Sequence, residues 1–108
     1  MRQQLTQRPF HFMDTVFGTD VTTSAVYQLP SASVPNGASG AIVANTGSTT
    51  IWYTGGNTVV AGPSGIGIVL GPGQDFTLRD NVANLTRLRF AILNNVANGR
   101  LTWQFILE

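Results

Sequence analysis

Few side chains in this sequence carry acid, base or metal-ligand chemistry. The acidic residues are four Asp and the terminal Glu, the only imidazole belongs to His11, and there is no Cys. Asp75 and Asp80 flank a predicted strand, which suggests a paired-carboxylate site, but Asp in turns ordinarily caps its own backbone. His11 stands between Phe10 and Phe12, where packing or hydrogen bonding is a more common role than catalysis. Because neither a zinc cluster nor a calcium-loop spacing occurs, we expect no catalytic site, no metal and no cofactor.

Three aromatic residues and one glycine-rich segment are weaker signals of ligand binding. Trp52, Tyr53 and Trp103 could form a stacking platform for a sugar, as in small β-sandwich carbohydrate-binding modules. Trp52 and Tyr53 are adjacent and point to opposite faces of a strand, and Trp103 shares the face of a predicted core strand, so we expect at most one exposed ring. Residues 62–67 lack the Gly-Lys-Ser/Thr ending of a phosphate-binding loop, and turn geometry explains their glycines.

The composition predicts one domain that contacts other proteins. The 108 residues suffice for a single core, and charged residues make up 10% of them, against about a quarter in an ordinary globular chain. A net charge of +1 gives no broad positive field, so we expect no nucleic-acid partner. All six basic residues are Arg, which suits partly desolvated subunit contacts, although biased genomic composition gives the same pattern. Without a signal peptide or an apolar window of about 18 residues, we expect a soluble, uncleaved chain outside the membrane.

Short apolar runs separated by Gly, Pro and Asn turns predict an all-β fold. The alternation is clearest near the C-terminus, where Leu101, Trp103, Phe105 and Leu107 share one face. Strands recurring about every ten residues are typical of a single antiparallel β-sandwich or barrel with seven or eight short strands. The predicted strands cover residues 21–29, 41–44, 49–54, 58–61, 66–70, 76–78, 85–93 and 101–107.

Two local predictions are specific enough to test against the structure. Residues 45–48, Asn-Thr-Gly-Ser, are expected to join strands 41–44 and 49–54 as a hairpin. Residues 80–88 are expected to form a turn and the start of a strand, with at most one short helical turn, because Asn favours turns over helix interiors. In strand 85–93 the alternation places Arg87 and Arg89 together on a solvent or partner face, opposite the core residues Leu88, Phe90 and Ile92.

Residues 1–14 differ from the rest of the chain. They show no helical period and no sustained alternation, so we interpret them as an N-terminal arm that precedes a β-domain at residues 15–108. Fourteen extended residues span on the order of 45 Å, enough to reach a neighbouring subunit; an edge strand folded onto its own domain is the alternative. The expected partner-binding residues combine apolar side chains with Arg, which binds carboxylates well: Arg2, Arg8, Phe10, Phe12, Met13, Arg87 and Arg89.

Three segments carry a resemblance to a known family: residues 21–30 (VTTSAVYQLP), 42–53 (IVANTGSTTIWY) and 70–78 (LGPGQDFTL). In this order they resemble the small all-β structural proteins of tailed-bacteriophage virions, of the head-decoration and head-spike-base type. The resemblance covers about residues 21–107 and leaves out residues 1–18.

That resemblance implies a non-enzymatic virion protein, assembled in the host cytoplasm, that binds the major capsid protein on the outside of a phage head. It also implies a homo-oligomer, for which trimers and pentamers suit capsid axes. A tail or head-to-tail connector component is an alternative of the same class. A carbohydrate-binding module that holds a surface glycan is the alternative of another class.

Overall fold

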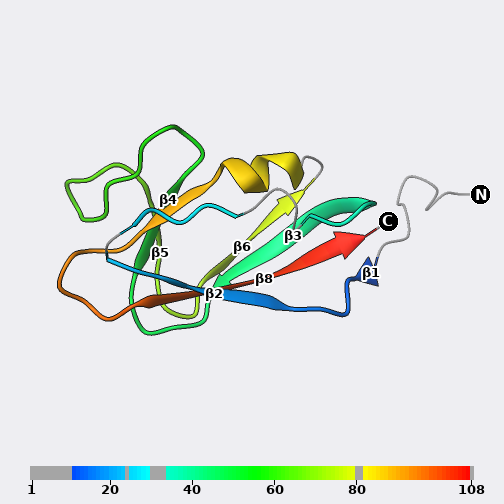
Figure 1. Cartoon of the computed structure of the whole chain (residues 1–108), viewed down its shortest axis with the longest axis horizontal. Helices are drawn as coiled ribbons and strands as arrows, with labels where there is room; N and C mark the ends of the chain where they lie inside the picture. The colour runs from blue at the N-terminus through cyan, green and yellow to red at the C-terminus, as the bar shows by residue number, and fades with distance from the viewer. Residues whose placement is uncertain (1–10, 24, 30–33, 80–81, 108) are drawn as a thin grey trace, which may run out of the picture.

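The computed structural model describes residues 11–23, 25–29, 34–79 and 82–107. They form two antiparallel sheets (Figure 1), one of five strands and one of three. The prediction of an all-β fold is confirmed, and the two sheets do not close into a barrel. The larger sheet contains β1 (His11–Phe12), β2 (Phe17–Val21), β8 (Gly99–Leu107), β3 (Ala38–Asn45) and β6 (Asp75–Arg79), and the smaller contains β5 (Ile68–Leu70), β4 (Ile51–Thr54) and β7 (Arg89–Ala91).

The longest strands lie at the centre of the larger sheet. β8 pairs with β3 on one side and with both β1 and β2 on the other, and β3 also pairs with β6. In Figure 1, β3, β6 and β8 run side by side. Leu101, Trp103 and Phe105 of β8 are buried, which confirms the alternation read from the sequence. Because its polar residues point to the other face, β8 can pack one side against a core while remaining hydrogen-bonded on both edges.

The main core lies between the two sheets. It combines Val43 and Phe105 of the larger sheet with Ile51 and Phe90 of the smaller one. A second, smaller cluster forms on the opposite face of the three-stranded sheet, where Trp52 packs with Val59 and Ala91. The smaller sheet therefore buries Ile51 and Phe90 on one face and Trp52 and Ala91 on the other, whereas Ile68 and Val69 of β5 remain exposed.

The hairpin predicted at residues 45–48 is wrong. β3 and β4 belong to different sheets, so the Asn-Thr-Gly-Ser turn carries the chain from one sheet to the other. Asn45 is fully buried, and its Nδ2 donates to the carbonyl oxygens of Thr49, at 2.8 Å, and Leu70, at 2.9 Å. Its Oδ1 accepts from the backbone N–H of Gly47 at 3.1 Å. These bonds turn the chain out of the larger sheet, where a hairpin would have folded it back along β3.

Two predicted strands are replaced by single bridges. In the segment predicted as strand 21–29, β2 ends at Val21, and within the described residues only Tyr27 pairs, through a bridge to Phe90. In the segment predicted as strand 58–61, Val60 forms a bridge to Ile66. Alternation of apolar residues was therefore not sufficient for either segment to form a strand ladder.

The strand predicted over residues 85–93 is shorter than expected. Its first part belongs to a 3-10 helix, η3 (Val82–Arg87), and the strand proper is β7, Arg89–Ala91. Leu88, Phe90 and Ile92 are buried as expected. Arg87 and Arg89 do not share a strand face, because Arg87 ends the 3-10 helix.

Candidate functional site

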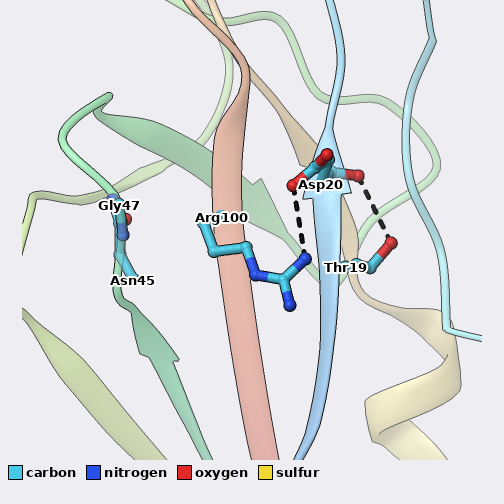
Figure 2. Close-up of polar contacts among 5 residues, drawn as sticks. All are labelled: Thr19, Asp20, Asn45, Gly47 and Arg100. Carbon is cyan, nitrogen blue, oxygen red and sulfur yellow. Dashed lines mark hydrogen bonds and ion pairs between the residues drawn. The ribbon is translucent and has the colours of Figure 1, made fainter.

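The acidic residues and His11 do not form a catalytic constellation within the described residues. Asp75 is exposed at the start of β6, and His11 lies on β1, whereas Asp80 lies outside the described residues. Asp20 pairs with Arg100 across β2 and β8 at 3.3 Å (Figure 2). Both side chains are about half exposed, so solvent weakens this ion pair. Among the described residues no group of three or more His, Cys, Asp or Glu could hold a metal ion.

The three aromatic residues considered for sugar stacking do not form a platform. Trp52 is 8% exposed and Trp103 is 5% exposed. Tyr53 is half-buried, and its ring stacks on Phe76 with centroids 4.7 Å apart. The core position expected for Trp103 is confirmed. A sugar-stacking site needs an exposed ring face, and neither indole offers one.

The predicted arm residues that the structure describes join the domain's own sheet. His11 and Phe12 pair with Leu107 and Ile106 of β8. The N–H of Met13 donates to the carbonyl oxygen of Phe105 at 2.9 Å, and Met13 packs against the main core. Phe12 remains 43% exposed. Arg2, Arg8 and Phe10 lie outside the described residues.

The two remaining partner-binding candidates lie on separate elements. Arg87 is exposed at the end of η3. Arg89 is half-buried on β7, and its Nη1 donates to the carbonyl oxygen of Gly56 at 3.0 Å. Arg89 therefore holds the turn that follows β4. Phe12 belongs to β1 of the larger sheet and Met13 follows it, whereas Arg89 belongs to the smaller sheet and Arg87 to η3, so these four residues come from separate elements.

A shallow groove with an uncharged lining, part aliphatic and part polar, lies beside the three-stranded sheet. It has a volume of about 340 Å³. Val26 is 50% exposed, Val60 48% and Leu93 38%, so three large aliphatic side chains that could be buried stand in contact with water. No acidic or basic side chain lines this groove: the residues around it are Thr23, Ala25, Val26, Val59, Val60, Ala61, Ala91, Ile92, Leu93 and Asn94.

A glycine-rich turn holds the outer wall of the groove in place. Val60 and Ile66 exchange two backbone hydrogen bonds of 2.8 and 2.9 Å, and the N–H of Gly65 donates to the carbonyl oxygen of Gly62 at 2.9 Å. A Cβ on Gly65 would collide with the backbone carbonyl of Val60. Only glycine allows this close approach, so the Gly-Pro-Ser-Gly sequence shapes the groove.

Further exposed apolar side chains lie at Ile66 and on β5. Ile66, which bridges to Val60, is 54% exposed, Ile68 is 61% exposed and Val69 is 54% exposed. Ile68 and Val69 are adjacent on β5, so their side chains point to opposite faces of the smaller sheet. The amino-acid sequence contains a signal for this exposed apolar character. No Asp, Glu, Lys, Arg or His stands between Asp20 and Asp75, whereas a solvated surface ordinarily carries charges of both signs.

Comparisons with protein-family models, with curated proteins and with solved structures found no match to this chain. Within the described residues, no helix has the length and apolar character needed to cross a membrane. Inference about function therefore depends on the geometry of the chain itself.

Proposed function

We propose that this chain is a non-enzymatic structural protein that adheres to another protein through the uncharged groove. The role that its sequence resemblance implies is that of a subunit on the outside of a phage head, bound to the major capsid protein as a decoration or spike-base protein. The observation that carries the proposal is the groove itself, with Val26, Val60 and Leu93 exposed and no charged residue in its lining. Exposed aliphatic side chains that gather around a hollow, with polar groups beside them, are typical of protein-binding sites.

The chemistry of the groove defines the partner. Its lining offers aliphatic side chains together with the polar groups of Thr23 and Asn94. A complementary partner would insert an aliphatic or aromatic side chain, with uncharged groups at the rim. Burial of apolar area contributes about 25 cal/mol per Å² before association costs are subtracted. A single groove would give modest affinity, and repetition on a symmetric particle would multiply it.

Binding to purified heads of the phage that encodes the chain tests the proposal. Leu93→Asp and Val26→Asp each place a charge in the groove, and we expect either variant to lose co-sedimentation with heads while its thermal unfolding remains cooperative. Val16→Asp is the matched control, because Val16 is 60% exposed, lies between β1 and β2, and does not line the groove. Equal binding by all three variants, or no binding by the unmodified chain, would contradict the proposal.

A further inference from the structure

The smaller sheet has one covered edge and one open edge. At β7, the N–H of Tyr27 donates to the carbonyl oxygen of Phe90 and the N–H of Phe90 donates to that of Tyr27, both at 2.9 Å. Tyr27 thereby closes this edge. β5, at the other side of the sheet, pairs with β4 alone among the described strands. Within the described part of the chain, its outer edge therefore has no strand partner for its backbone groups.

The pairing pattern identifies which residue of β5 faces outward. In antiparallel sheets the N–H and C=O of one residue point to the same side, and successive residues alternate. Because Phe90 bonds to Tyr27, its backbone groups point away from β4, and those of Tyr53, its partner on β4, must point towards β5. Tyr53 faces Ile68, so Ile68 bonds to β4. The next residue, Val69, directs both its N–H and its C=O outward.

Charged side chains lie on the edge strands β2, β6 and β7 and are missing from β5. Asp20 lies on β2, Asp75 and Arg79 lie at the two ends of β6, and Arg89 lies on β7. Charged residues on edge strands discourage pairing with another chain. β5 carries none, and its side chains Ile68 and Val69 are more than half exposed. An edge strand that carries charged residues would lose hydration of those charges if it paired with the uncharged β5. The β5 strand of a second copy is also uncharged, so it can pair without that cost.

We propose that two copies of the chain pair through their β5 strands, antiparallel and about a two-fold axis at Val69. The N–H of Val69 donates to the carbonyl oxygen of the second copy's Val69, and the reciprocal bond follows from the symmetry. The two three-stranded sheets then form one continuous sheet with the order β7-β4-β5-β5-β4-β7. This self-pairing uses the strand edge and is independent of the groove and of the proposed partner that fills it.

The contact is small. The N–H and C=O of Gly71 already bond to Gln74, so the added ladder is confined to the neighbourhood of Val69. It falls below the roughly 1,200 Å² at which stable interfaces begin. We therefore expect a weak dimer, with a dissociation constant on the order of 0.1–1 mM.

Sedimentation equilibrium of the full chain over a concentration series provides the test. We expect the unmodified chain to dimerise, and Val69→Lys and Val69→Glu to remain monomeric, because like charges would meet at the two-fold axis. An equimolar mixture of these two variants should recover a dimer that contains one copy of each. Thr77→Lys, an exposed change on the β6 edge strand, is the control and should dimerise like the unmodified chain.

A proline variant separates the backbone contact from the side-chain contact. Val69→Pro removes the outward N–H without removing a bond to β4, so we expect a folded monomer. Ile68→Pro removes a bond to β4 and should lower the melting temperature. The proposal is overturned if the unmodified chain stays monomeric, if Val69→Lys still dimerises, or if the mixed Lys and Glu variants show no recovery.

Discussion

The side-chain Nδ2 of Asn45, on β3, lies 2.9 Å from the carbonyl oxygen of Leu70, on β5, and donates a hydrogen bond to it inside the protein. The backbone of Asn45 also bonds to the loop before β6, accepting from the N–H of Gly73 and donating to the carbonyl oxygen of Gln74, both at 2.9 Å. One buried residue therefore fixes the junction between the two sheets. Figure 2 shows this residue and Gly47 on the opposite side of Arg100 from Asp20.

Asn45→Ala should destabilise the domain strongly. It leaves the carbonyl oxygens of Thr49 and Leu70 and the N–H of Gly47 without their side-chain partner, and each unsatisfied buried group costs about 1–3 kcal/mol. We expect the free energy of unfolding in urea to fall by about 3 kcal/mol or more. Asn57→Ala, at an exposed position in the turn after β4, is the control and should change it by less than about 0.5 kcal/mol. Similar values for the two variants would mean that water replaces the Asn45 amide.

Trp103→Phe should cost little, although the residue is buried. The indole Nε1 of Trp103 is buried and has no hydrogen-bond partner among the residues that the structure describes, so removing it relieves a desolvation penalty that offsets part of the lost packing. We expect a loss below about 1.5 kcal/mol, against about 3–5 kcal/mol for Phe105→Ala in the same strand. A loss for Trp103→Phe as large as that for Phe105→Ala would indicate that the indole N–H does find a partner in solution.

Gly65→Ala should disrupt the outer wall of the groove. The added methyl group collides with the Val60 carbonyl, which is backbone and cannot rotate away. We expect the free energy of unfolding to fall by about 2 kcal/mol, seen as a lower melting temperature. Binding of the variant to the proposed partner, the phage head, should also weaken. Gly55→Ala is the matched control, since its nearest neighbour would be the Leu88 Cδ2 at an ordinary 3.9 Å. Unchanged stability of Gly65→Ala would show that the turn shifts without cost.

Two N-terminal deletions should show how much residues 11–13, at the end of the predicted arm, contribute to the stability of the domain. We compare a chain that lacks residues 1–10 with one that lacks residues 1–13. The longer deletion also removes the pairing of β1 with β8, the bond from Met13 to Phe105, and the 2.8 Å bond from Gln104 Nε2 to the carbonyl oxygen of Met13. We expect this extension to reduce the free energy of unfolding by about 2–4 kcal/mol. Equal stability of the two variants would mean that Met13 does not stabilise its own domain, which would favour the predicted role of Met13 in partner binding.

Local alternation was sufficient to predict the strands whose faces differ most. β8 was predictable because Leu101, Trp103 and Phe105 alternate with polar residues, and the buried centre of β3 was predictable from its apolar run. β2 was missed because Gly18 and Asp20 disfavour a strand locally. Its pairing with residues 99–103 of β8 outweighs that preference, and no neighbouring residue signals it.

The direction of the turn at Asn45 and the position of the groove depend on contacts between residues that are far apart in the sequence. The Asn-Thr-Gly-Ser sequence indicated a turn at Asn45, but its direction depends on Leu70, far along the chain. The groove was not predictable either, because Val26, Val60 and Leu93 come from three distant segments. Of the predicted partner-binding residues, Met13 and Arg89 make contacts within the domain, which side-chain type alone does not reveal, and their role in partner binding stays a prediction.

The lack of charged residues between Asp20 and Asp75 affects the salt concentrations and pH values at which the protein can bind a partner. Dissolved salt weakens attraction between charged groups, and acid neutralises carboxylates, but neither acts directly on contact between aliphatic side chains. Contacts built on the groove and on β5 should therefore persist from dilute to concentrated salt and over a wide pH range. A complex that relied on Asp20 and Arg100 would loosen under the same changes.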